Sequence, residues 1–419
     1  MARTKDSQII SVVHPICCGL DVHKDQVSAC MLFSGEGGET ESEIREFSTF
    51  TDDIERLRDW LVKEECPVVA VESTGVYWRP VHNVLEHHLE VILVNARHVK
   101  NVKGRKTDIS DCKWLAGLLR HGLLRGSFIP PQEVRMWREL WTARQSYVRT
   151  IGDFRRRIHK ILQCANIKID SVVSDLFGVT GRNLMKCLIA RGNEITLDEI
   201  EECARGTLRA KCEELHRSLK GFFLSHHAIL LATLLKTVET LESQMEDVTS
   251  RLRSLMTDHD SLLDRLDAVP GINEIGAMGI LSYTGVDLSA FPKAENFCSW
   301  QGLCPGNNES AGKRHSGRPA VNKHPLKGLF IELAWTAVKK KGSYYKDKFH
   351  RLKARRGAKR AIVAIAHKLA RAVYHIIKDG ADYRELGEDY LDTRNAALKT
   401  KRLRAQAKAL GFDLIPTVA

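Results

Sequence analysis

The first third of the chain alternates short apolar runs with amphipathic segments. Apolar runs predict strands within 16–33, with a turn near Lys24 and Asp25, and at 67–72 and 90–95; a further strand is expected at 43–50. Segments with helical spacing predict helices at 54–65, 77–88 and 108–122. Strands that come first and then alternate with helices indicate an α/β domain with a mixed sheet.

Beyond Gln132 the apolar positions have mainly helical spacing. Between 231 and 255 they alternate steps of three and four residues, at Leu231, Leu234, Val238, Leu241, Met245, Val248, Leu252 and Leu255. This heptad pattern predicts a coiled coil, either with an antiparallel helix of the same chain or at a dimer interface. The stretch 167–217 has no regular pattern and is left unassigned.

The C-terminal part is predicted to be mainly helical. Leu266–Leu281 contains a Pro-Gly-Ile turn between two helical stretches, which is typical of a helix-hairpin-helix that offers backbone N–H groups to phosphate. Asn273 stands where a second glycine is usual, and asparagine tolerates the left-handed conformation. A plain helix-turn-helix core fits the pattern equally well. Further helices are expected at 297–300, 325–340, 344–355 and 359–378, with a polar loop at 302–318 and a charged tail after Asp379.

The basic residues are concentrated near the C-terminus. The whole chain has a formal net charge of +12, and residues 311–419 hold 26 Lys and Arg against 9 Asp and Glu, a net charge of +17. The preceding residues therefore carry a net charge of −5. A basic segment interleaved with apolar helical positions favours a nucleic-acid partner over a merely solvated surface.

Cysteine usage and hydropathy restrict the class of protein. The eleven cysteines include no C-x-x-C pair, which favours reduced thiols over a disulfide framework or a zinc site. No stretch approaches the roughly 20 apolar residues of a membrane span. The N-terminal residues lack the pattern of a signal peptide, so a cytoplasmic protein without a membrane partner is expected.

Four carboxylates in the first part of the chain are candidate metal ligands. Asp21 and Glu72 each end an apolar run, and Asp108 and Asp111 are three residues apart at a predicted helix start. Each acid alone is more simply a surface residue or a helix cap. Four clustered carboxylates would destabilise the fold without a cation, and carboxylate oxygens suit Mg²⁺. The grouping predicts a site for one or two Mg²⁺ ions that serves phosphoryl chemistry.

Ser310, followed by Ala-Gly, is the candidate nucleophile of the polar loop. On its chemistry alone it is a loop serine that hydrogen-bonds to its own backbone, since no general base can be assigned to it. His315 is near in sequence, but most such histidines are surface residues.

Several motifs together resemble one family, the DEDD transposases of bacterial insertion sequences. These are the family of insertion sequence one-ten and the Piv-type DNA invertases, described as bridge-RNA-guided recombinases. The resemblance is carried by six runs: Gly19-Leu-Asp-Val-His-Lys24, Val71-Glu-Ser-Thr-Gly-Val-Tyr77, Lys106-Thr-Asp-Ile-Ser-Asp111, Val269-Pro-Gly-Ile272, Trp300-Gln-Gly-Leu-Cys-Pro305 and Glu309-Ser-Ala-Gly312.

The resemblance implies a domain order. A RuvC-like (RNase H-type) DEDD domain would span 14–128, a helical and coiled-coil region 129–262, a C-terminal transposase domain 263–380, and a charged tail 381–419.

The resemblance also implies a chemistry and a set of partners. Asp21, Glu72, Asp108 and Asp111 would bind Mg²⁺, and Ser310 would be the nucleophile that forms a covalent phosphoserine with DNA. Homodimers or homotetramers would assemble on a structured guide RNA that pairs with target and donor DNA. The tetrad of one protomer would face the serine of another. Phosphate contacts would come from basic residues after the serine, with Lys313, Arg314 and Arg318 as candidates.

Two other functions remain open at this point. One is a Mg²⁺-dependent, structure-selective nuclease of the RuvC type, in which Ser310 is incidental. The other is a nucleic-acid-binding protein without catalysis, although the presence of all four acids argues against it.

Overall fold

The computed structural model describes residues 11–34, 39–73, 75–95, 111–305, 308–310, 313–316 and 324–413. The chain forms two compact units, Met1–Ile129 and Pro130–Ala419. Each unit is described by itself. The finer division into four parts stays a prediction.

The first unit contains the mixed sheet that the sequence predicts. Its strand order is β3-β2-β1-β4-β5. β1 pairs antiparallel with β2 and parallel with β4, β2 pairs antiparallel with β3, and β4 pairs parallel with β5. The strands are β1 (Cys17–Val22), β2 (Gln26–Ser34), β3 (Thr40–Ser48), β4 (Val68–Glu72) and β5 (Glu90–Val94). This arrangement fits an RNase H-like α/β domain.

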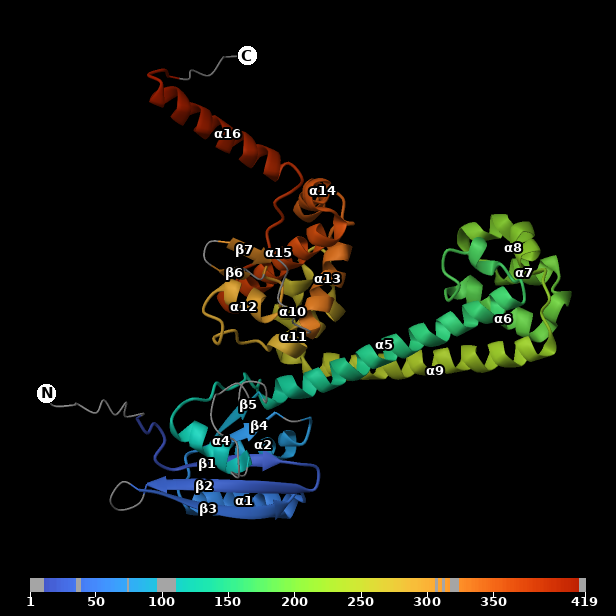
Figure 1. The fold of residues 1–419 in the computed structure, drawn as a ribbon. Helices are drawn as coiled ribbons and strands as arrows, with labels where there is room; N and C mark the ends of the chain where they lie inside the picture. The colour runs from blue at the N-terminus through green and yellow to red at the C-terminus, as the bar shows by residue number, and fades with distance from the viewer. Residues whose placement is uncertain are drawn as a thin grey trace. The chain divides into compact units, whose positions relative to one another are not determined.

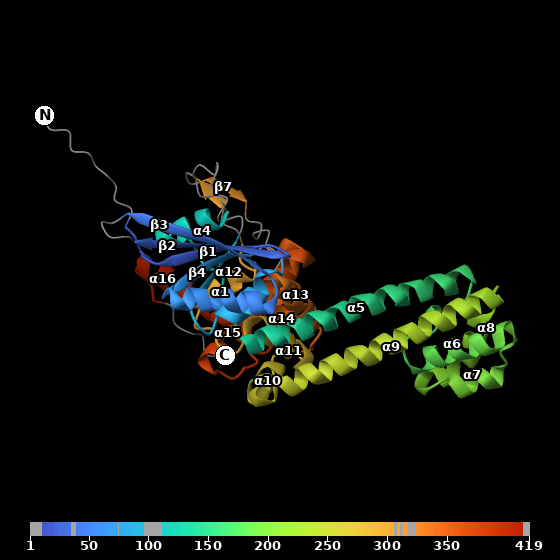
Figure 2. The ribbon, with the colours of Figure 1, turned by 90° about the horizontal axis from the view of Figure 1, so that it is seen from below.

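Helices cover both faces of the sheet (Figures 1 and 2). α1 (Thr51–Lys63) and α2 (Trp78–Leu85) share one hydrophobic core with side chains such as Leu20 and Val71. α4 (Asp111–Arg120) packs on the opposite face, against Cys17 and Ala70. Because side chains alternate along a strand, β1, β2, β4 and β5 each contribute to both cores.

The packing of α4 on β1 requires a glycine. A Cβ atom at Gly19 would lie 2.2 Å from the carbonyl oxygen of Cys112 and 2.5 Å from the amide nitrogen of Ala116. The other end of α4 is held by Arg120, whose buried guanidinium donates to Pro15 O and Ser34 Oγ, both at 2.8 Å. The helix is therefore fixed on the sheet at both ends.

Gly19→Ala is expected to destabilise the first unit by about 1–3 kcal/mol, because the added methyl group meets backbone atoms that cannot move alone. Chemical denaturation followed by circular dichroism measures this loss. Gly117→Ala on the same helix is the matched control: its Cβ atom meets nothing within 4 Å, so it should be neutral or slightly stabilising. Equal stability of the two variants would contradict the account of the packing.

Two long helices form the predicted coiled coil within the chain. α5 (Gln132–Cys164) and α9 (Ser225–Leu255) lie side by side and antiparallel in both overall views (Figures 1 and 2). Leu231, Val238 and Leu252 of the predicted seam are buried. Thr249 takes a buried position that the apolar pattern did not indicate, where its hydroxyl accepts from Arg144 Nε at 3.0 Å.

The stretch between these helices, unassigned from the sequence, forms a small helical subdomain. It contains α6 (Val179–Arg191), α7 (Leu197–Cys203) and α8 (Cys212–Leu219), and it shares a core with α5 and α9.

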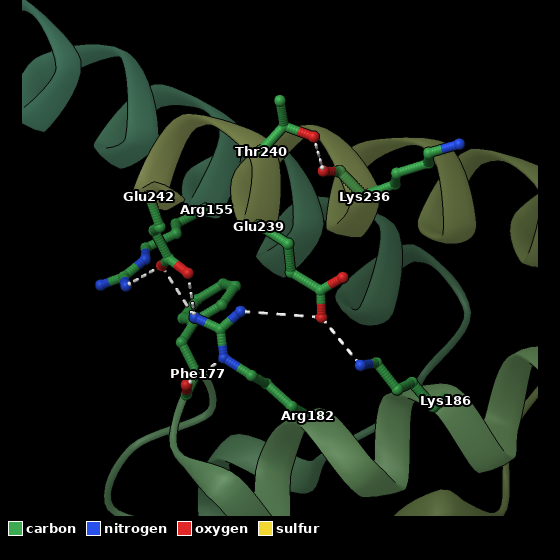
Figure 3. Close-up of polar contacts among 8 residues, drawn as sticks. All are labelled: Arg155, Phe177, Arg182, Lys186, Lys236, Glu239, Thr240 and Glu242. Carbon is green, nitrogen blue, oxygen red and sulfur yellow. Dashed lines mark hydrogen bonds and ion pairs between the residues drawn. The ribbon is translucent and has the colours of Figure 1, made fainter. Parts of the chain in front are cut away.

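Ion pairs tie this subdomain to the coiled coil (Figure 3). Arg182 of α6 donates to both carboxylate oxygens of Glu242, at 2.7 and 2.8 Å, and Arg155 of α5 donates to the same carboxylate at 2.7 Å. Lys186 lies 2.9 Å from Glu239. Burial raises the pKa of Glu242, but the hydrogen bonds from both arginines outweigh this effect and lower the pKa overall.

The remaining helices share the largest core of the chain. They are α10 (Asp260–Asp267), α11 (Glu274–Thr284), α12 (Ala294–Trp300), α13 (Pro325–Ala337), α14 (Tyr344–Arg356) and α15 (Ala358–Asp379). Among the described residues, no helix is long and apolar enough to cross a membrane.

The turn between α10 and α11 differs in detail from the expected hairpin. Asn273 is extended, with φ −111°, and its side chain caps α11 by accepting from Gly276 N. Gly271 is the left-handed residue, with φ 88°, and a Cβ atom there would lie 2.4 Å from Ala337 N of α13. Since the turn packs closely against α13 at Gly271, this backbone serves the core, and a phosphate-binding hairpin gains no support.

Three elements, two strands and a helix, lie where the sequence predicted a loop or a tail. The polar loop contains a short antiparallel pair, β6 (Asn308–Ser310) and β7 (Lys313–Ser316). The charged tail contains a long helix, α16 (Tyr390–Ala409).

Candidate functional site

The sheet register aligns Asp21 and Glu72. Leu20 is the partner of Val71 across the parallel pair β1 and β4, so the two acids occupy the next position of each strand. Both strands run in the same direction and end here, at the carboxyl edge where open α/β sheets usually bind ligands. Leu20 and Val71 lie in the core beneath α1 and α2. By alternation the two acids belong to the opposite face, which α4 covers.

Asp111 is the first residue of α4. Cys112, the next residue, is the one whose carbonyl oxygen makes the close contact at Gly19. Gly19 is two residues before Asp21 on β1. The start of α4 and the acidic end of β1 are therefore on the same face of the sheet.

The described side chains do not by themselves complete a metal site. Within the described ranges, no group of three or more His, Cys, Asp or Glu side chains is close enough to hold a metal ion. Asp108 lies outside the described residues. Asp21 and Glu72 are each half-buried, and Asp111 is exposed.

His23 is a neighbour of the acids that the sequence analysis did not single out. Its Nε2 atom lies 3.3 Å from Oδ2 of Asp21, and its side chain is 67% exposed. The i, i+2 spacing of the two residues could have indicated this contact, because such residues lie on the same side of an extended chain.

Ser310 is the last residue of β6, and its register partner in β7 is Lys313. The adjacent pair joins Glu309 with Arg314. The hairpin backbone thus brings two of the predicted basic residues alongside the serine segment. Arg318 lies outside the described residues.

His324 is a second residue that the sequence analysis missed. Its Nδ1 atom accepts a hydrogen bond from Leu326 N at the start of α13, and its ring lies 4.2 Å from that of Trp300. Burial, with a smaller contribution from the charge of Arg138, lowers the pKa of His324 to about 4. The imidazole therefore stays neutral well below physiological pH, because of its packing.

Comparison with protein families finds two matches, one in each of two separate stretches of the chain. A model of DEDD transposases of the IS110 type, described as Transposase, matches residues 18–167. A second, described as Transposase IS116/IS110/IS902 family, matches residues 263–351. No curated protein sequence matches the chain. The DEDD class suggests dependence on a divalent metal, and a transposase has DNA as its substrate. The two matches cover more than half of the sequence in the expected order, so the chain belongs to the IS110 family of transposases and is a DNA transposase or recombinase.

Proposed function

We propose that this transposase cuts and rejoins DNA through a covalent phosphoserine at Ser310, with Mg²⁺ held by Asp21, Glu72, Asp108 and Asp111. The observation that carries the metal half of the proposal is the register of β1 on β4. It aligns Asp21 with Glu72 at one sheet edge, on the face where α4 begins with Asp111.

The donor chemistry fits a hard divalent cation. Carboxylate oxygens are the ligands that Mg²⁺ prefers, and it keeps several waters, so the protein need not enclose it completely. When bound, the metal would offset negative charge on the scissile phosphate as the transition state forms. The carboxylates would hold the positive charge of the metal at the sheet edge. The exposed position of Asp111 leaves room there for a DNA backbone.

Ser310 would supply the nucleophile. Its Oγ atom gives up its proton and forms a bond to phosphorus, the bond between phosphorus and one sugar oxygen breaks, and that oxygen takes up a proton and leaves as a hydroxyl. Attack by the hydroxyl of another strand reverses these changes, releases the serine and restores a phosphodiester. The number of phosphoester bonds is conserved, so strand exchange requires no ATP.

Asp21→Asn and Glu72→Gln are each expected to reduce DNA strand cleavage by roughly a hundredfold or more, since loss of a ligand weakens metal stabilisation of the transition state. Cleavage of labelled DNA in Mg²⁺, compared with EDTA, measures the effect. Asp25→Asn, an exposed acid in the turn after β1, is the matched control and should cut normally. Full cleavage by both site variants would refute the metal assignment.

Ser310→Ala is expected to abolish both cleavage and strand exchange while DNA binding persists. The reason is that alanine has no oxygen to attack phosphorus. Electrophoresis of labelled substrates and products measures both steps, and Ser316→Ala, in the adjacent strand β7, serves as the control. A Ser310→Ala protein that still cuts DNA would indicate a hydrolytic nuclease instead.

The proposal extends to a structured guide RNA as the partner that reads sequence. Support comes from the net charge of +17 on residues 311–419, which favours binding of nucleic-acid backbone. A protein whose RNA pairs with target and donor DNA needs to recognise mainly shape and phosphate. The RNA would also organise the homodimer or homotetramer.

Ribonuclease treatment of the purified protein is expected to abolish recombination and to lower the particle mass in light scattering. Adding back the co-purified RNA should restore both. Undiminished recombination after complete removal of RNA would contradict the proposal that a guide RNA is required.

A further inference from the structure

A pocket lies between α14, α15, α16 and the segment that joins the last two helices. Its volume is about 350 Å³. Four tyrosines line it, together with the cations Lys368, Arg384 and Arg394. Most of it lies beyond residue 351, where the second family match ends. Of the residues that line it, only Tyr344 and Tyr345 fall within that match.

The tyrosine rings surround the pocket in two pairs. Tyr344 and Tyr390 meet edge to face, with centroids 5.8 Å apart. Tyr345 and Tyr383 are stacked, with centroids 6.3 Å apart and an interplanar angle of 18°. Tyr345 is buried, whereas Tyr344, Tyr383 and Tyr390 are half-buried and keep part of their surface available. Partly exposed rings of this kind offer faces or edges to a flat ligand.

Positive charges converge beside these rings from three helices. Burial lowers the pKa of Lys368, and the charges of Arg371, Lys348 and Arg394 lower it further. Burial and the charge of Arg394 also lower the pKa of Lys348. Like charges held this closely repel one another, and an anion placed among them would relieve that repulsion.

The acidic groups near the pocket do not cancel its positive charge. Glu385 accepts hydrogen bonds from Tyr344 N, Tyr383 Oη and Gly387 N, and so holds the joining segment in place. Asp382 is the acid that lines the pocket itself, and it offsets only part of the positive charge.

The start of α16 is anchored, so the side of the pocket that this helix forms has a defined position. Arg351 of α14 donates to Asp347 at 2.9 Å and to Asp392 of α16 at 2.6 Å. Leu391 is buried. Beyond Arg394 the same helix continues with exposed basic residues, among them Lys401 and Arg404.

We propose that this pocket binds an unpaired nucleotide, with the base against Tyr344 and Tyr390 and the phosphate beside Lys368 and Arg394. Stacking of bases on aromatic rings next to a basic groove is how proteins hold single strands. The basic surface of α16 provides a path for the backbone on either side of that nucleotide. The inference rests on the action of the protein on nucleic acid and is independent of the chemistry of Ser310.

Fluorescence of 2-aminopurine tests the pocket in the full-length protein. The probes are short single-stranded oligothymidine and oligouridine with one internal 2-aminopurine, and a blunt duplex for comparison. The wild-type protein should quench the single-stranded probes on binding. Tyr390→Leu should lose the quenching and bind them about tenfold more weakly, with duplex affinity within about twofold of wild type. Comparison of the DNA and RNA probes shows whether the pocket prefers a nucleotide of DNA or of RNA.

Matched variants separate the pocket from general electrostatics and from misfolding. Tyr390→Phe keeps the ring and should bind as the wild type does. Lys368→Gln should weaken binding, whereas Arg404→Gln removes an equal charge outside the pocket and should have a smaller effect. Circular dichroism verifies folding. Ser310→Ala should bind the probes normally, so failure of the serine chemistry would not be mistaken for failure of the pocket.

The proposal is overturned if Tyr390→Leu, correctly folded, binds and quenches the probes like wild type. It is also overturned if an oligonucleotide with abasic sites binds as tightly as one with bases, since the tyrosines would then contribute nothing.

Discussion

The contact between α4 and β1 at Gly19 is the constraint on which the candidate metal site depends. A helix normally packs on a sheet through side chains on both elements, but here the helix backbone reaches the strand backbone because Gly19 has no Cβ atom. On the helix, the contact lies in the first turn of α4, directly after Asp111. On the strand, it lies at Gly19, two residues before Asp21. Arg120 holds the far end of the same helix. A shift of α4 would move Asp111 away from the sheet edge while leaving Asp21 and Glu72 in register.

The parts of the fold with strong periodicity could be predicted from the sequence. β1, β4 and β5 are largely apolar runs, and the seam of α9 repeats every seven residues. β6 and β7 were missed because their residues are polar, and α16 was missed because it has little apolar surface, with Leu391 as its main buried side chain. The close packing at Gly19 and Gly271, and the burial of His324 beside Trp300, depend on neighbours distant in sequence. No local pattern could have revealed them.

The candidate chemistry divides into two functions with different residues. Carboxylates that hold Mg²⁺ at a sheet edge can promote cleavage of a phosphodiester by water, which is the chemistry of many nucleases. A serine that retains the cut end as an ester makes rejoining possible. The family assignment gives a DNA transposase or recombinase, and our proposal connects that activity to these two groups. The basic C-terminal part, with its tyrosine pocket, would then hold nucleic acid for both steps.

Identification of the atom that joins protein to DNA tests the central claim most directly. The protein would be denatured during reaction with DNA in Mg²⁺, digested with protease and nuclease, and analysed by mass spectrometry for a peptide that carries a nucleotide. Our account predicts a phosphodiester on the hydroxyl of Ser310. An adduct on any other residue, or efficient strand exchange with no adduct at any time, would contradict it.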